Sequence, residues 1–418
     1  MLDYIRKLWK IEDLRKKILY TFGMLILFRL VGCIPAPGID LSRLGMNESN
    51  LPLLDIMNMM TGGQMSQMTI MAMGISPYIN ASIIMQLLCI ALPALERMQQ
   101  EEDGREKINR ISRYVTIALA VVQAIGLSKG LGYAKSGLWN NILIGVSMAG
   151  GTALAMWIGE RITEKGIGNG ISLLIFAGIV SNLFNGIVGG FRSATTVQGF
   201  LGALVILVVL VILTFVVTFV DLGERRIPLQ IAKQVKGRRV YGGQNTHMTL
   251  KVIAVGVMPL IFAYSFLSFP GTIGQMVAPH SGFTAWCTTY LKNGAWLHLI
   301  LSAILIFAFT FFYSSISFDA KKQAEQLQQQ GATIPGRRGK EIAAFLQRTT
   351  NRLNLFAALF LAVLAAIPTL MLSGLNLQVP FAASSMLIAV SVSLETMRTI
   401  KGEMAIRGIE SDKDNGFM

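Results

Sequence analysis

The sequence predicts an all-α membrane protein with ten transmembrane helices in two inverted halves of five. Three observations lead to this fold class. Of 418 residues, 53% are hydrophobic and only 14% charged, whereas soluble domains carry about a quarter charged residues. The mean hydropathy is +0.55, and the apolar runs are continuous rather than alternating, which argues against a β-barrel. Finally, positive charge gathers on one predicted side of the membrane.

Each predicted span is an apolar run close to the roughly 20 residues that cross a bilayer. The spans are expected at about 18–35, 75–95, 114–133, 142–158, 171–190, 200–220, 253–273, 296–318, 353–373 and 380–397. An even number of spans places both termini on the same side. Inverted repeats of five spans are a common plan for transport folds.

The distribution of Lys and Arg orients the chain. Among the predicted outer loops, only the following basic residues occur: Arg43, Lys129, Lys135, Arg192 and Lys292. Arg29 falls inside the first span, and the rest of the 37 Lys and Arg residues lie on the other side. By the positive-inside rule, both termini and the large loops are therefore expected to be cytoplasmic. The basic face also favours contact with anionic lipids.

Four segments outside the spans have their own character. Residues 1–17 pattern as a basic amphipathic helix on the cytoplasmic surface. The outer loop 36–74 ends in a Met-rich stretch with little charge, which we expect to fold back into the protein. Loop 221–252 has β-forming residues and a Gly-Gly turn signal, which favour a hairpin. Loop 319–352 reads as helix, Gly-Pro-Gly break and helix.

Two spans begin with unusual breaks. The stretch MAMGISPYINASIIMQLL at 71–88 contains Gly74 and Pro77, and Ile75 and Ile79 stand four residues apart on one helical face. The stretch WIGERITEKGIGNGISLLIFAGI begins at Trp157, and its glycine-rich turn is followed by Ile171 and Ile175. The same pattern, a break and then two isoleucines, thus occurs twice. Any one of these isoleucines alone would be read as ordinary packing.

The sequence argues against several kinds of chemistry. It has three His and three Cys residues, without a metal-ligand spacing or a nucleophile elbow, so neither a metal nor a cofactor is expected, nor an enzyme. The Gly331-to-Gly336 stretch is followed by two arginines rather than Lys and Ser/Thr, which excludes a phosphate loop. Carboxylates lie at the ends of spans, not in their middles. A solute carrier with broken helices is the alternative reading, but it lacks midplane ligands.

The two broken spans closely resemble the signature segments of the SecY family, which forms the channel of the general protein-secretion (Sec) translocon. GERRIPLQIAKQVKGRRVYGGQNTHMTLK and GATIPGRRGKE are similar to that family's two large cytoplasmic loops. The resemblance covers essentially the whole chain. It implies an hourglass-shaped pore with a plug and a lateral gate, through which unfolded secretory polypeptides pass and membrane spans leave sideways into lipid.

The resemblance also assigns roles to residues. A ring of aliphatic side chains would close the waist of the pore, and the matching residues are Ile75, Ile79, Ile171, Ile175, Ile261 and Ile388. The plug would be about residues 54–66. The lateral gate would lie between spans two and three and spans seven and eight, with Asn80, Ser82 and Gln86 as candidate gate residues. Sequence alone leaves open which of these three faces the gate.

The basic loops match family positions that dock the motor ATPase SecA or the ribosome. The matching residues are Arg225, Arg226, Lys233, Arg238, Arg239, Tyr241, Arg337 and Arg338. SecE and SecG-type small membrane subunits are further implied partners, together with signal sequences. The implied location is the bacterial cytoplasmic membrane.

The expected organisation of the chain follows. An N-terminal helix at 1–17 precedes an N-terminal half at 18–190 with spans one to five. A C-terminal half at 191–397 carries spans six to ten and loops 221–252 and 319–352, and a cytoplasmic tail covers 398–418.

Overall fold

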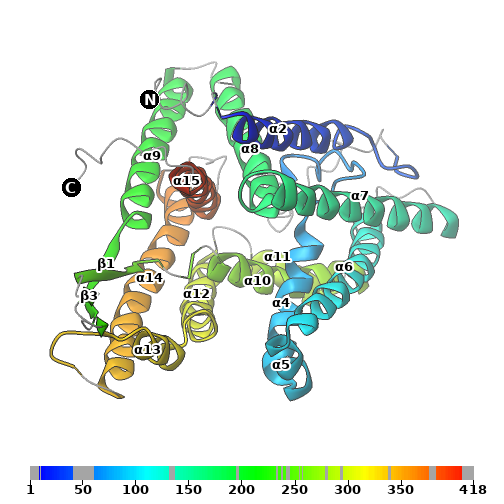
Figure 1. The fold of residues 1–418 in the computed structure, drawn as a ribbon. Coiled ribbons are helices and arrows are strands. Elements are labelled where there is room, and N and C mark those ends of the chain that lie inside the picture. The colour runs from blue at the N-terminus through cyan, green and yellow to red at the C-terminus, as the bar shows by residue number, and fades with distance from the viewer. Residues whose placement is uncertain are drawn as a thin grey trace.

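The computed structural model describes residues 9, 11–40, 61–130, 137–193, 197–231, 234–236, 239–241, 245–253, 255–256, 258–277, 281–291, 295–337, 340–375 and 383–406. Helices dominate these residues (Figure 1). The long helices are α2 (Glu12–Val31), α4 (Ser76–Ala91), α6 (Glu102–Gly130), α7 (Leu138–Lys165), α8 (Gly170–Ser193), α9 (Val197–Asp221), α10 (Met258–Val277), α12 (Trp296–Ser317), α14 (Lys340–Leu375) and α15 (Ala383–Ile406). Shorter helices are α5 (Pro93–Gln100), α11 (Gly282–Tyr290) and α13 (Ala320–Gln329).

Each of the ten long helices overlaps one predicted span. Within the described residues, five helices are long and apolar enough to cross a membrane, or six when the bent pair α4–α5 is counted as one span. Several of the others carry charged turns at one end: α2 begins with Glu12 and Asp13 and contains Arg29 in its last turn. α2 also runs without a break across the predicted boundary between residues 17 and 18.

The second span ends earlier than the hydropathy of residues 92–95 predicted. α4 stops at Ala91, and α5 starts at Pro93 with a bend of 107° between the two helices. The residue before a proline is driven out of the α conformation, and Leu92 accordingly has φ −111° and ψ 110°. Pro93 then fits the first turn of α5, where its missing N–H costs nothing.

The helices form two halves that meet at opposite edges. α2, α4, α6, α7 and α8 pack among themselves, and α10, α12 and α14 form a second group in which α12 contacts both of the others. The two halves are connected where α8 leads into α9, at the top of Figure 1. They also touch where α10 packs against α6, in the lower part of Figure 1. α15 completes the contact by packing on α8 and α9.

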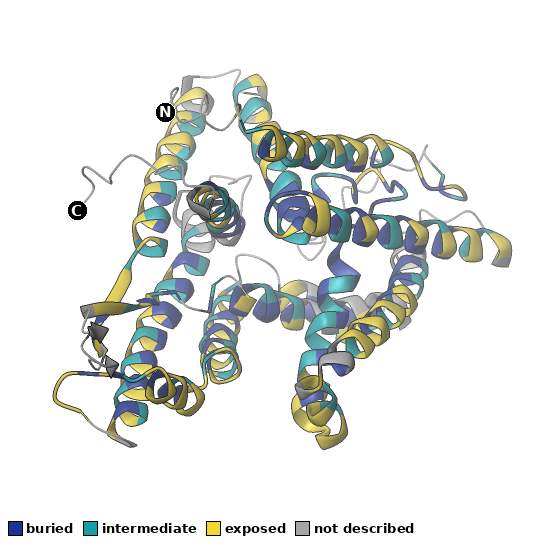
Figure 2. Cartoon of the chain, viewed as in Figure 1, coloured by how far each residue is buried: buried dark blue, intermediate teal, exposed yellow. Residues whose placement is uncertain are grey.

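Burial follows this arrangement rather than simple hydropathy. Small and aliphatic side chains fill the helix interfaces, whereas one face of α9 leaves large apolar side chains exposed (Figure 2). Phe215 and Phe219 on α9 are each 73% exposed. A helix with such an apolar exposed surface is stable only in lipid or beneath another membrane helix.

The two large loops combine into a single sheet, which the sequence did not predict. β1 (Glu224–Ile231) pairs antiparallel with β4 (Asn245–Lys251), as a hairpin requires. β5 (Ala332–Thr333), from the second loop, adds to the other edge of β1. A separate pair joins β2 (Gln234–Lys236) to β3 (Arg239–Tyr241). The predicted hairpin, and the predicted helix, break and helix in the second loop, are thus confirmed.

Candidate functional site

α4 begins at a tight glycine turn. Gly74 has φ +50°, and a Cβ there would lie 2.9 Å from the Thr61 side chain, so the chain passes too close for a larger residue. Pro77 occupies the first turn of α4, where it suits a helix start. The Ile79 N–H donates to the Ile75 carbonyl over 3.1 Å. Both isoleucine side chains are buried on the same face.

α8 begins with a side-chain cap. Asn169 Oδ1 accepts hydrogen bonds from the Ile171 and Ser172 N–H groups, over 3.1 and 3.3 Å. A Cβ on Gly170 would lie only 2.0 Å from the carbonyl oxygen of Gly159 in α7, so α7 and α8 cross in close contact here. This crossing fixes where Ile171 and Ile175 lie.

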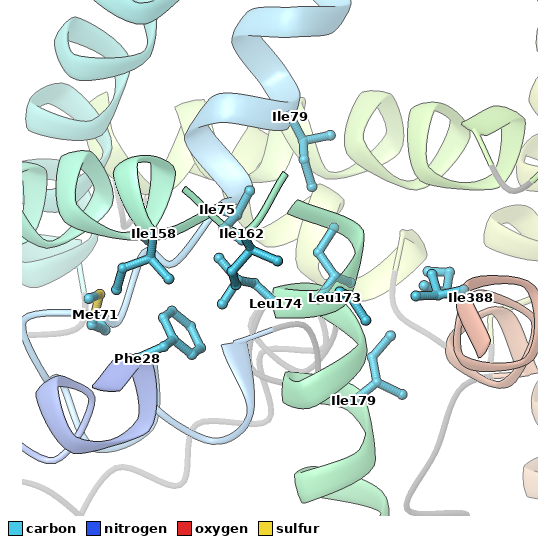
Figure 3. Close-up of a cluster of buried hydrophobic side chains, with 13 residues drawn as sticks. Phe28, Met71, Ile75, Ile79, Ile158, Ile162, Leu173, Leu174, Ile179 and Ile388 are labelled. Carbon is cyan, nitrogen blue, oxygen red and sulfur yellow. The ribbon is translucent and has the colours of Figure 1, made fainter. Parts of the chain in front are cut away.

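All six predicted ring isoleucines meet in one hydrophobic cluster. Ile75, Ile79, Ile175 and Ile388 are buried members of it, and Ile171 and Ile261 pack against it half-buried. Five of them lie on the helices α4, α8, α10 and α15, which are far apart in sequence, and Ile75 is the residue just before α4. Figure 3 shows Ile75, Ile79 and Ile388 among the other side chains of this cluster. The cluster also contains Phe28 of α2 and Met71, just before α4.

A cavity of about 380 Å³ opens above this cluster. Five of the six isoleucines line it, and Ile75 is the one that does not. The rest of the lining changes from apolar to polar and charged. Its polar and charged members are Tyr78, Ser82, Gln86, Asn169, Ser172, Asp221, Lys251, Ser391, Glu395 and Arg398.

The charged end of this cavity was not predicted as part of the site. Ser391 Oγ of α15 donates to Asp221 Oδ1 of α9 over 3.3 Å, and Arg398 of α15 lies 3.8 Å from Glu224 of β1. The sequence analysis placed carboxylates at the ends of spans and assigned none of them to a site. Asp221, Lys251 and Arg398 flank or belong to segments that the sequence predicts to be cytoplasmic. The lining of the cavity thus combines aliphatic side chains with polar and charged ones.

The three candidate gate residues do not share one position. Ser82 and Gln86 line the cavity, and Gln86 Nε2 lies 3.5 Å from Ser82 Oγ. Asn80 is half-buried and is not part of the lining. The contact between α6 and α10 brings predicted span three against predicted span seven.

Residues 61–66 of the predicted plug are described, while 54–60 lie outside the described residues. Thr61, Gln64 and Met65 are buried. Met65 and Met68 pack with Ile144 and Met148 of α7 in a second cluster. Methionine tolerates imperfect packing, as reversible docking requires.

The predicted docking residues that the structure describes lie on the strands of the two large loops or beside them. Arg225 and Arg226 are exposed on β1. Arg239 and Tyr241 belong to β3. Arg337 is exposed, and its guanidinium stacks 3.7 Å above the Phe345 ring. Lys233, Arg238 and Arg338 lie outside the described residues. Since β5 pairs with β1, arginines of both loops belong to one connected structure.

Comparison with known proteins agrees with this geometry. The SecY family model matches residues 69–397. The protein translocase subunit SecY of Streptomyces scabiei is 37% identical, over 98% of this chain and 99% of its own. The same subunit of Escherichia coli K12 is 39% identical, over 98% and 96%.

Solved structures share the fold at lower identity. A protein-conducting channel superposes with a TM-score of 0.70 at 19% identity, over 95% of each chain. Sec61 in a canine ribosome–channel complex gives 0.65 at 17% identity, over 95% of each chain. With a family model that spans most of the sequence and relatives that align from end to end, the chain belongs to the SecY family.

Proposed function

We propose that this chain is the channel-forming subunit of a Sec protein translocase. It passes unfolded secretory polypeptides across the membrane and releases membrane spans sideways into lipid. The observation that carries the proposal is the meeting of six isoleucines in one cluster, five of which line a cavity whose other end is polar and charged. We assign that charged end to the cytoplasmic side. Membership of the SecY family agrees with it.

The isoleucine ring serves as the seal. A narrow apolar constriction excludes water and ions without carrying any charge. Isoleucine is branched at Cβ and has few χ1 rotamers, so the ring keeps its shape. It also offers no hydrogen bond to a passing chain. A polypeptide of any sequence can therefore slide through without being held.

The plug and the gate act on either side of this ring. We assign residues 54–66 to the plug, supported by the burial of Thr61, Gln64 and Met65. We assign the gate to the α6–α10 edge, away from the α8–α9 connection (Figure 1). Polar contacts between membrane helices are worth only about 0.6–2 kcal/mol. Contacts of that size keep a gate shut and still yield to a hydrophobic signal sequence.

The driving force comes from outside the chain. The exposed arginines on β1 and beside β5 suit forked hydrogen bonds to carboxylates of SecA or phosphates of ribosomal RNA. The Sec61 neighbour was solved bound to a ribosome, which supports the second of these partners. SecE and SecG-type subunits complete the translocase in the bacterial cytoplasmic membrane, with both termini of this chain cytoplasmic and anionic lipids at its basic face.

Reconstitution tests this function. Proteoliposomes that contain this chain with SecE, SecG and SecA should make a secretory precursor resistant to external protease when ATP is supplied. Vesicles that lack this chain are the control. If the precursor stays fully digestible and the vesicles instead accumulate small solutes against an ion gradient, the protein is a solute carrier and the proposal is wrong.

A further inference from the structure

We infer that Arg29 is the positioning residue of the resting channel, because it ties the plug to α8, the helix that carries Ile171 and Ile175 of the isoleucine ring. This inference rests on the proposed function. One guanidinium nitrogen, Nη1, donates to the Gly62 carbonyl in the plug over 3.3 Å. The other, Nη2, donates to the Ala177 carbonyl in α8 over 2.6 Å. A single side chain of α2 thus joins three separate segments.

Because Arg29 lies within a predicted membrane span, its two hydrogen bonds are expected to be strong. Arg29 is the one charged residue of the predicted first span, and it lies near the outer end of α2. A charged side chain at membrane depth is costly unless it is paired or faces the protein interior. Hydrogen bonds from a charged donor are stronger than those between neutral groups. Both acceptors are backbone oxygens, so the contact depends on where the two segments lie rather than on their side chains.

The rest of the plug region is held in a different way. A β-bridge joins Pro35 to Thr69, and the Ile70 N–H donates to the Ile34 carbonyl over 3.0 Å. These backbone bonds anchor the residues just after the plug to the residues that follow α2. Gly62, which Arg29 holds, lies seven residues before this anchor. The guanidinium therefore restrains the part of the plug that must move for a passenger to leave the ring.

The second acceptor connects the plug with the ring. Ala177 follows Ile175 by two residues and Ile171 by six residues in α8. Phe28, next to Arg29, is itself a buried member of the isoleucine cluster. When a passenger pushes α8 outward, the Ala177 carbonyl must move relative to α2. Widening of the ring thus strains the same side chain that restrains the plug.

Gly62 allows a test that leaves the arginine in place. A Cβ on Gly62 would lie 2.5 Å from both Nη1 and Nη2 of Arg29, so alanine there must push the guanidinium away. Gly63 is a matched control. Its φ of +87° is as strained for alanine as the +74° of Gly62, but its Cβ would meet only Asn182 Oδ1, at 3.4 Å. The pair separates loss of the arginine contact from backbone strain.

The measurement is labelling of the plug from the outer side with a membrane-impermeant maleimide. Thr61, which is 2% exposed, is replaced by cysteine in a chain whose native cysteines are changed to serine. The reconstituted translocase is labelled at rest, and the ion conductance of the same membranes is recorded. Ser66→Cys, at an exposed position of the same segment, reports that the reagent reaches the plug in every variant.

We expect Arg29→Met and Gly62→Ala to label Thr61→Cys roughly tenfold faster or more than the parent, as loss of hydrogen bonds to a charged group implies. Both should raise the resting conductance, and Arg29→Lys should lie between because it retains the charge without the fork. Arg192→Met, which removes an exposed arginine from the end of α8, and Gly63→Ala should match the parent.

Parent-like labelling in Gly62→Ala, or equal acceleration in Gly62→Ala and Gly63→Ala, would overturn the inference even if Arg29→Met did not fold. Export of a secretory precursor by the parent protein is measured in the same vesicles. If the parent fails to export, the proposed function is wrong. If it exports and the variants label as the parent does, only the role of Arg29 is wrong.

Discussion

Replacing Ile79 or Ile171 with glycine is expected to make the resting channel conduct ions. Each change removes a whole aliphatic side chain from the cavity lining, where these two residues meet Ile175, Ile261 and Ile388. Water and ions enter an apolar constriction once it is wide enough to stay wet. Conductance across a planar bilayer should rise from near zero to persistent openings. Export of a precursor should continue, because the passenger itself blocks the wider ring.

The control for this experiment is Ile212→Gly in α9. Ile212 is 55% exposed on α9 and does not belong to the isoleucine cluster. Glycine within a helix lowers stability by about 1 kcal/mol relative to alanine at either position. The variants therefore share this backbone effect, and only the ring variants lose a side chain from the isoleucine cluster. Silent bilayers with both ring variants, or equal leakage from Ile212→Gly, would count against the seal.

Arg337→Glu is expected to abolish motor-driven or ribosome-driven export while the protein still inserts and folds. Arg337 is exposed in the second cytoplasmic loop, beside the strand that joins it to the first loop. Reversing its charge removes a forked donor and repels the carboxylates or phosphates of a partner. Losing its stacking on Phe345 costs the fold only about 0.5–1 kcal/mol at an exposed site. Export assays and partner binding in the same membranes measure the effect.

Lys322→Glu in α13 makes the same charge change on an exposed residue of the same loop. It should export nearly as well as the parent. Normal export by Arg337→Glu would refute docking at this arginine, and equal loss in both variants would point to the overall charge of the loop instead.

The positions of the membrane helices were largely predictable because hydropathy is a local property. The residues at which these helices begin and end were less predictable. α6 begins at Glu102 rather than near 114, and α14 begins at Lys340 rather than near 353. Both helices continue as charged turns beyond the apolar run, where hydropathy carries no signal. The bend at Leu92 could have been found from Pro93, which forbids a continuous helix there.

The candidate site was predictable where a family motif marks it. The breaks before Ile75 and Ile171 drew attention to the isoleucines of the second and fifth spans, and the resemblance supplied Ile261 and Ile388. All of them meet in one cluster. The pairing of β5 with β1 and the two bonds of Arg29 could not be predicted. The strands pair through backbone atoms, and the Arg29 guanidinium donates to backbone carbonyl oxygens, which every residue possesses. Such contacts leave no pattern in residue type.

The most direct test of the account is cross-linking from the ring to a passenger. A photoreactive residue at position 79 or 261 should form an adduct with a secretory chain stalled halfway through the translocase. The same probe at Phe219, which is 73% exposed on α9, should label lipid or a neighbouring membrane helix instead. Adducts at 79 and 261 without one at 219 would place the passenger inside the aliphatic ring. Passenger adducts at 219 with none at the ring would contradict the account.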